Sequence, residues 1–483
     1  MPRKRRFRAA RTEAPRYGGV VHGLPGGAMV ITNSERKDMN CGRRWWFSRG
    51  AMLKSPPSQV LRFGSLFDEC MGLLLRYYKL FDRPYGVELD ESCRVCRGDD
   101  PDCPNCEGTG ASFWVRAWRE ATTGLDDEMG VSVDMICDAL EGWLRTWDHV
   151  MAESWEVVDI QPQIAVPITN TEGIQYKSKV PVVRIENGWR LADARDGMDD
   201  IEFVMLPWFQ LCKLDAVVRN KETGALRVWE TKTSGSPDQF TRNLHLDTQL
   251  PGYSRALWYA VSVLGVYEGT VEGYVWDVTS NKPHRRPKVL KSGKVSLASN
   301  QRVPSWRWGE YIEANCDSES KLIAFARDGR AKVSAAEAAG TKPPKQLTDS
   351  LKEVAYQLKI YEMARLAYMD FDLSLHRREH GTHTLEDLAE YEAELFQAAS
   401  QKARWLRELP GSMGLSRTEM ANKWSRRPIC RLPGGFCPYT GPCASKIEDG
   451  SLSWEAFDRR EHLLWLTTAF VKEQKKKEGE NGR

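Results

Sequence analysis

Two CxxC elements separated by six residues place the strongest constraint on what this 483-residue chain can fold into. They lie in the segment CRVCRGDDPDCPNCEGTG, and their cysteines are Cys93, Cys96, Cys103 and Cys106. Paired CxxC turns with glycine and proline between them can arrange four thiolates tetrahedrally around Zn²⁺, and structural zinc supplies folding free energy on the order of 10 kcal/mol. We therefore predict a zinc knuckle at residues 90–112, inserted into a larger domain.

Composition narrows the class of protein further. The chain has no run of about 18 apolar residues, and its first residues are basic without the apolar stretch of a signal peptide. We therefore expect a cytoplasmic protein that does not bind a membrane, in which cysteines are metal ligands more readily than disulfides. The 69 Lys and Arg residues nearly balance the 66 Asp and Glu residues, so any affinity for nucleic acid must come from local patches.

The pattern of apolar residues predicts an α/β fold, in which helices and strands follow one another along the chain. Apolar residues at helical spacing predict helices over 58–81, 129–152, 247–264 and most of 319–425. Alternating or short apolar runs predict strands over 157–168, 213–219, 226–233 and 270–278.

The same pattern predicts how the chain is divided. We expect a disordered basic arm at 1–30, a core domain at 31–290 that carries the knuckle, a helical region at 291–450, and a C-terminal helix with a charged tail at 451–483.

Candidate chemistry lies on the two short strands before residue 234. Glu230 and Lys232 are two residues apart on a strand, so their side chains leave the same face, and a hairpin through Gly224 can bring Asp215 beside them. Carboxylate oxygens suit hard divalent cations such as Mg²⁺, and an ammonium group can orient a water molecule and offset charge on a reacting phosphate. Taken alone, however, alternating Glu and Lys residues are also typical of a solvated strand face.

A glutamine and a tyrosine follow these strands on the next predicted helix. Gln249 and Tyr253 lie four residues apart, so they share one helix face. In this order the segments KLDAVV, WETKTSG and QLPGYSRAL resemble the PD-(D/E)xK nuclease superfamily, and in particular the RecB/AddB-like iron-sulfur exonucleases with their CRISPR-associated branch. The resemblance implies a restriction-endonuclease-like core, which is a mixed β-sheet flanked by helices, and in which Gln249 and Tyr253 support the site or the DNA.

The resemblance also implies a role for each residue of the strands. Asp215, Glu230 and the backbone carbonyl of Thr231 would hold Mg²⁺ or Mn²⁺, and Lys232 would be catalytic. The implied activity is a metal-dependent DNA nuclease, with exonuclease action during DNA end processing or recombination. One position departs from the family, because Asp68 in FGSLFDE stands where relatives carry histidine.

Distant cysteines extend the resemblance. One branch of the family joins an N-terminal cysteine to three C-terminal ones around a [4Fe-4S] cluster, and Cys41, Cys430, Cys437 and Cys443 would fill these places. The spacing of the last three cysteines departs from the usual pattern, and a zinc site with four cysteine ligands is the structural rival.

The resemblance further implies the setting in which the chain works. It implies DNA as the substrate, a phage or mobile element as the source, the cytoplasm of a bacterial host, and a helicase, an annealing protein or another recombination subunit as a partner. The alternative function is a non-catalytic zinc and iron-sulfur DNA-binding subunit of a recombination or CRISPR-adaptation complex. Asp68 in place of histidine is the sequence argument for that alternative.

A third function class is a zinc peptidase. His376, Glu379 and His380 spell HxxEH, with which inverted zinc peptidases supply two ligands and a base from a helix. The surrounding HRREHGTH is charged and interrupted by glycine, so we interpret this segment as a solvated helix end.

Overall fold

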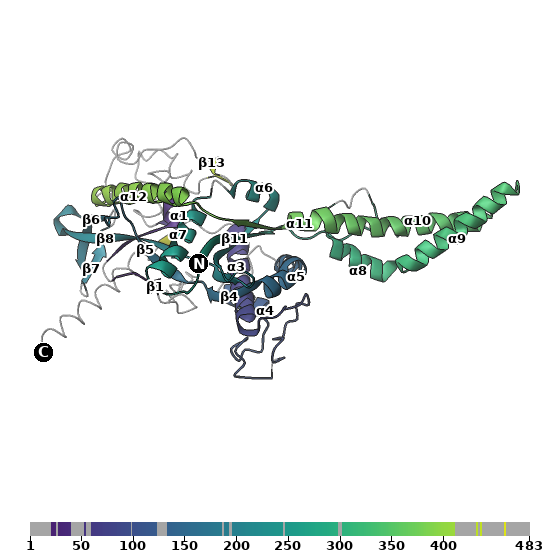
Figure 1. The fold of residues 1–483 in the computed structure, drawn as a ribbon, viewed down its shortest axis with the longest axis horizontal. Coiled ribbons are helices and arrows are strands. Elements are labelled where there is room, and N and C mark those ends of the chain that lie inside the picture. The colour runs from purple at the N-terminus through teal and green to yellow at the C-terminus, as the bar shows by residue number, and fades with distance from the viewer. Residues whose placement is uncertain are drawn as a thin grey trace, which may run out of the picture.

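The computed structural model shows a mixed α/β body from which a helical arm projects (Figure 1). It describes residues 21–25, 28–39, 53–54, 59–97, 99–122, 133–185, 188–192, 196–244, 247–297, 302–410, 431–432, 435–436 and 458–459. Most of the predicted basic arm and charged tail lie outside these ranges. No helix that the structure describes combines the length and the apolar composition needed to cross a bilayer.

A five-stranded sheet forms the centre of the body, in the order β12-β11-β10-β9-β4. Its strands are β4 (Trp155–Ile160), β9 (Ala216–Asn220), β10 (Leu226–Ser234), β11 (Val271–Ser280) and β12 (His376–Gly381). β10 and β11 are parallel, whereas the other neighbours are antiparallel, so the predicted mixed sheet is confirmed. The predicted turn between β9 and β10 is also present, since Gly224 has a φ of 71°.

A second sheet has six strands, in the order β1-β5-β8-β6-β7 with β2 beside β8. Its strands are β1 (Val21–His22), β2 (Met29–Thr32), β5 (Gln163–Pro167), β6 (Lys177–Ile185), β7 (Gly188–Leu191) and β8 (Ile201–Lys213). The prediction of one strand over 157–168 is wrong, because the chain breaks into β4 and β5 at Gln161 and Pro162. Gln161 has a φ of 50° and Pro162 lacks a donor N–H, so the two strands join different sheets.

Helices cover both faces of the five-stranded sheet. They are α3 (Gln59–Phe81), α4 (Phe113–Thr122) and α5 (Val133–Ser154) on one side and α7 (Gln249–Ser262) on the other. Successive residues of β10 show the division. Trp229 belongs to the core cluster that contains Leu74 of α3 and Trp143 of α5, whereas Val228 belongs to the cluster that contains Leu257 of α7. Each predicted helix in this region is confirmed, with bounds shifted by a few residues.

The arm consists of α8 (Ser305–Asn315), α9 (Glu319–Ala338) and α10 (Lys345–Leu366), which extend away from the body (Figure 1). Trp308 and Ile360 form part of its own small core. The chain then returns through α11 (Asp372–Leu375) and β12 to α12 (Leu385–Glu408), which covers the six-stranded sheet. The short helices α1 (Asn33–Met39) and α6 (Pro237–Arg242) complete the body.

The interpretation of HRREHG as a solvated helix end is wrong, because this segment is the edge strand β12. Thr279 opposes His376 in the register with β11, and His376 is fully buried. A strand can accommodate this charged segment because alternate side chains turn toward opposite faces. In a strand, His376 and His380 are separated by about 13 Å along the chain, whereas i and i+4 residues of a helix lie about 5–6 Å apart. The geometry therefore removes the basis of the zinc-peptidase motif.

Candidate functional site

Strand β10 carries the central residues of the candidate site, which is the group formed by Asp215, Glu230, Lys232, Gln249 and Tyr253. Glu230 and Lys232 leave the strand on the same face as Val228, which is the face that α7 covers. Glu230 is completely buried, whereas Lys232 keeps 29% of its side chain exposed. The site therefore has a buried carboxylate at its base and a cation toward its opening.

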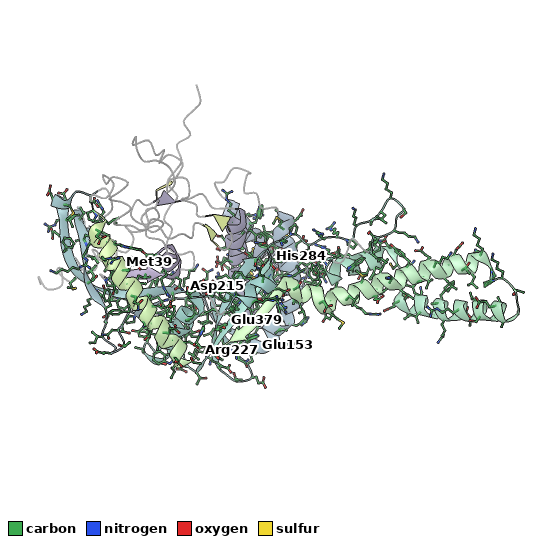
Figure 2. The ribbon with its side chains drawn as sticks, turned by 90° about the horizontal axis from the view of Figure 1, so that it is seen from above. Met39, Glu153, Asp215, Arg227, His284 and Glu379 are labelled. Carbon is green, nitrogen blue, oxygen red and sulfur yellow. The ribbon has the colours of Figure 1, made fainter. Side chains whose placement is uncertain are left out.

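Asp215 comes to this strand through the connection between β8 and β9. Ala216 opposes Trp229 in the β9/β10 register, so the adjacent position brings Asp215 beside Glu230. One carboxylate oxygen of Asp215 accepts a hydrogen bond from the backbone N–H of Thr231 at 2.7 Å, and its backbone carbonyl accepts one from the N–H of Gln161 at 2.9 Å. The first bond orients the Asp215 carboxylate and the second holds its backbone, and the residue remains partly exposed. Figure 2 shows the place of Asp215 in the body of the molecule.

Helix α7 closes the site with its first turns. The Gln249 amide donates to Glu230 Oε1 at 3.1 Å and also donates to the Tyr253 hydroxyl. Asp247 holds the start of this helix, since its carboxylate accepts the N–H of Gln249 at 2.6 Å. The structure thus brings Gln249 into direct contact with the strand carboxylate, and Tyr253 into contact with Gln249.

The charges at the site are strongly coupled. Burial raises the pKa of Glu230 well above its usual range, and the neighbouring Asp215 carboxylate raises it further. Burial alone would lower the pKa of Lys232, but its hydrogen bond to Glu230 and the charges of Glu230 and Asp215 outweigh burial and raise it. Lys232 Nζ also lies 5.7 Å from the ring centroid of Trp276. Lys232 is therefore held as an ammonium ion in this arrangement.

Asp68 also belongs to this electrostatic cluster. It lies on α3, and its pKa is raised to about 7 by burial and by the Asp215 carboxylate, while Lys213 and Lys232 partly offset this rise. Close packing of α3 against β10 positions it, since a side-chain carbon at Gly64 would come within 3.2 Å of the Thr233 hydroxyl. The sequence pattern marked Asp68 as a departure, and the structure places it in the field of the predicted site.

One buried carboxylate oxygen of the candidate site could bind a divalent cation. Glu230 Oε2 is buried and has no hydrogen-bond partner among the described residues, which is an unfavourable state that a bound cation would relieve. Within the described part of the chain, the four knuckle cysteines are the one group of three or more ligand side chains close enough to share an ion. A cation at the carboxylates would therefore use Asp215 and Glu230, with the Thr231 carbonyl and water as further ligands, which is the way Mg²⁺ usually binds.

The raised pKa of Asp68 should make the stability of the protein depend on pH. The folded pKa of about 7 exceeds the ordinary value of 3.8, so folded protein keeps a proton that unfolded chain releases, and stability falls as pH rises through this window. We expect Asp68→Asn to stabilise the metal-free protein above pH 7 by about 1 kcal/mol, or roughly 2–4 °C in Tm, and the gain to disappear toward pH 4. Thermal unfolding in a chelator at both ends of this range measures the effect. The exposed Asp199→Asn is the matched control, and an equal gain in both variants would contradict the prediction.

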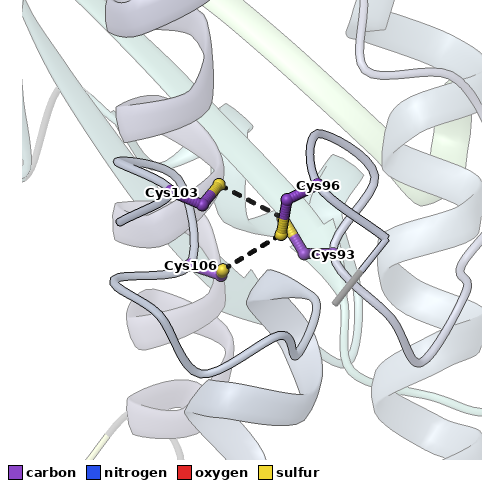
Figure 3. A group of neighbouring side chains, drawn as sticks. All are labelled: Cys93, Cys96, Cys103 and Cys106. Carbon is purple, nitrogen blue, oxygen red and sulfur yellow. Dashed lines mark hydrogen bonds between the residues drawn. The ribbon is translucent and has the colours of Figure 1, made fainter. Parts of the chain in front are cut away.

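The four knuckle cysteines form the second candidate site (Figure 3). Their sulfur atoms all lie within 4.8 Å of one another, with 3.9 Å between Cys93 and Cys103 and 3.5 Å between Cys96 and Cys106. Each CxxC turn closes in the same way, because the residue after its second cysteine takes a positive φ of 53° and donates its N–H to the first cysteine's carbonyl. The two turns therefore face each other as a pair of equivalent knuckles.

These thiols are close enough together to bind one metal ion. Burial raises the pKa of the Cys106 thiol to about 12, and its hydrogen bond with Cys96 adds to the rise. A bound cation reverses this preference, because it stabilises thiolates directly. Arg116 on α4 ties the knuckle to the body, since it donates to the Asn105 carbonyl at 2.8 Å and pairs with Glu107 at 2.9 Å.

The predicted cluster ligands Cys41, Cys430, Cys437 and Cys443 lie outside the described residues. The same holds for most of the segments that surround them. Their arrangement around an iron-sulfur cluster therefore stays a prediction.

Sequence reasoning missed one buried ion pair behind the candidate site. Arg378 of β12 lies 3.0 Å from Asp277 of β11, and both side chains are almost completely buried. The signal was available, because an aspartate within the apolar run YVWDV requires a buried partner.

No protein-family model matches this sequence, and no curated protein is significantly similar to it.

Proposed function

We propose that this chain is a Mg²⁺- or Mn²⁺-dependent deoxyribonuclease that hydrolyses phosphodiester bonds on a restriction-endonuclease-like core. One observation carries the proposal: Asp215, Glu230 and Lys232 converge on one face of β10, in contact with Gln249 of α7. An acid-rich site with one lysine and an orphaned carboxylate oxygen suits a cation that bridges protein and phosphate.

Each residue then has a defined task. Asp215 and Glu230 would hold the cation, with the Thr231 carbonyl beside them, and the cation would supply Lewis-acid polarisation of the phosphate. Lys232 would orient the attacking water and offset the charge that develops on phosphorus; its raised pKa favours this electrostatic role over that of a proton acceptor. Gln249 would orient Glu230 through their hydrogen bond, and Tyr253 would hold Gln249.

The proposal is tested with labelled single- and double-stranded DNA and purified protein in the presence of Mg²⁺, Mn²⁺, Ca²⁺ or a chelator. We expect cleavage with Mg²⁺ or Mn²⁺, none with the chelator, and a product ladder from DNA ends if the enzyme is an exonuclease. Tight DNA binding without cleavage under any divalent metal would overturn the proposal. It would favour a non-catalytic DNA-binding subunit of a recombination or CRISPR-adaptation complex, for which Asp68 is the sequence argument.

We also propose that the knuckle holds a structural Zn²⁺. The sulfur separations of 3.5 and 3.9 Å agree with the edge of roughly 3.8 Å that a tetrahedron with Zn–S bonds of about 2.3 Å requires. The [4Fe-4S] cluster at the terminal cysteines, a phage source, and a helicase or annealing protein as a partner remain proposals that rest on the resemblance alone.

Loss of one knuckle cysteine should release the zinc. We expect Cys103→Ala to lower the zinc content by one equivalent per chain and to make residues 90–112 sensitive to protease, because the segment has little core of its own. Elemental analysis and limited proteolysis measure these effects. Cys316→Ala, in the arm, is the matched control and should keep its zinc. Unchanged zinc content in Cys103→Ala would contradict the assignment.

A further inference from the structure

A basic cavity of about 580 Å³ opens beyond the ends of β10 and β11. Its lining includes the exposed cations Lys282, Arg285 and Arg302, together with Ser236 and the apolar side chains of Phe371 and Leu375. We call it the end pocket. It is formed by segments far apart in the sequence, which meet where the two parallel strands end and the arm returns to the body.

The end pocket carries uncompensated positive charge. Lys282, Arg285 and Arg302 form no ion pair with any residue that the structure describes. Asp238 also lines the pocket, but its carboxylate is paired with Arg377. The other lining residues are glycine, serines, prolines and apolar residues, which carry no charge, and His284. Burial lowers the pKa of His284 to about 4, so its imidazole is neutral at pH 7. The pocket is therefore suited to an anion with an apolar part.

The end pocket lies close to the candidate site. Gly235 belongs to its lining and follows Lys232 by three residues, which corresponds to roughly 10 Å along a strand. Phosphates of one DNA strand advance by about 3.4 Å per nucleotide along a B-form axis. A strand whose phosphate lies at Lys232 can therefore reach the pocket within about three nucleotides.

We propose that the end pocket binds the phosphate and sugar of a DNA strand about three nucleotides from the bond that is cut. Lys282, Arg285 and Arg302 contact the phosphate, while Phe371 and Leu375 contact the sugar or base. This inference rests on the proposed nuclease function and extends it by naming where the substrate strand is held. It also explains how a chain of nearly balanced charge binds DNA, since the attraction is local.

The test is equilibrium binding of a short fluorescein-labelled single-stranded DNA, measured by anisotropy in a chelator at several salt concentrations. The variant combines Lys282→Ala, Arg285→Ala and Arg302→Ala. The matched control removes three other exposed cations that do not line the pocket: Arg286→Ala, Lys291→Ala and Arg330→Ala. We expect the pocket variant to bind at least roughly tenfold more weakly and its slope of log affinity against log salt to become shallower by about 0.7, because the pocket holds one phosphate and each neutralised phosphate of a single strand contributes about 0.7.

The outcomes separate this inference from the proposed function. Equal losses in both variants, or no loss in the pocket variant, would overturn the pocket. DNA binding is measured without divalent metal, so it does not depend on cleavage. If the protein binds DNA through the pocket but cleaves it with no metal, the nuclease proposal is wrong and the pocket assignment still holds. Circular dichroism of both variants checks that the substitutions, all on exposed side chains, leave the fold intact. Competition by a free nucleoside monophosphate distinguishes the DNA strand from a single nucleotide, and full displacement at low concentration would overturn the DNA assignment.

Discussion

Replacement of Lys232 by alanine is expected to lower the rate of the proposed Mg²⁺-dependent DNA cleavage by roughly 10²–10³-fold. The reason is the placement of its ammonium group, which is bonded to Glu230 and held in the field of Asp215 and Asp68. In the proposed reaction, a cation in that position would stabilise negative charge that develops only in the transition state, so its loss should lower kcat more than it raises KM. Single-turnover cleavage of labelled DNA at saturating Mg²⁺ measures the effect.

Two controls make the loss of cleavage interpretable. Lys177→Ala removes an exposed lysine from β6 and should cut DNA at the rate of the unmodified protein. DNA affinity measured in a chelator should change little in Lys232→Ala, because the cations of the end pocket remain. Cleavage by Lys232→Ala within about twofold of the unmodified rate would show that the reaction does not use this lysine, and a loss shared by Lys177→Ala would point to an effect on DNA binding in general.

The sequence allowed the centre of the candidate site to be predicted because its residues follow local rules. Glu230 and Lys232 share a face through the two-residue period of a strand, and Gln249 and Tyr253 share one through the helical period. A tight hairpin joins β9 to β10, so the approach of Asp215 also followed from short-range structure. Two CxxC turns likewise carry their geometry within 14 residues, from Cys93 to Cys106.

The features that could not be predicted from the sequence depend on contacts between segments far apart along the chain. The position of Asp68 follows from the packing of α3 on β10, which no local pattern encodes. β12 was mistaken for a solvated helix end because Arg378 pairs with Asp277 of β11 and Arg377 pairs with Asp238 of α6. Both partners are separated from β12 in the sequence by the whole arm. The end pocket has the same origin, since Lys282 and Phe371 come together only when the chain returns from the arm. A charged segment such as β12 was therefore misinterpreted because the residues that pair with its charges lie far along the chain.

The buried ion pair of Asp277 and Arg378 is expected to have a large effect on the free energy of unfolding. Asp277 accepts a hydrogen bond from the Trp143 indole at 2.6 Å and lies 3.0 Å from Arg378, and neither side chain is exposed by more than 2%. The Arg378 guanidinium also lies over the rings of Trp147 and Trp229, at 4.2 and 4.4 Å from their centroids. Burial lowers the pKa of Arg378 and the Asp277 carboxylate opposes this shift. Because a guanidinium stays protonated, the carboxylate is the partner that offsets its charge in the core.

We therefore expect Asp277→Ala to lower the free energy of unfolding by about 3–5 kcal/mol, because it leaves a buried charge without its partner. Urea denaturation followed by tryptophan fluorescence measures the loss. The matched control is Asp328→Ala, which breaks an exposed ion pair with Lys332 in the arm and should change stability by less than about 1 kcal/mol. Adding Arg378→Met to Asp277→Ala should recover a large part of the loss, since an apolar side chain suits the indole cage better than an unpaired cation. An equally small effect in Asp277→Ala and Asp328→Ala would show that β12 is not anchored to the sheet through this pair.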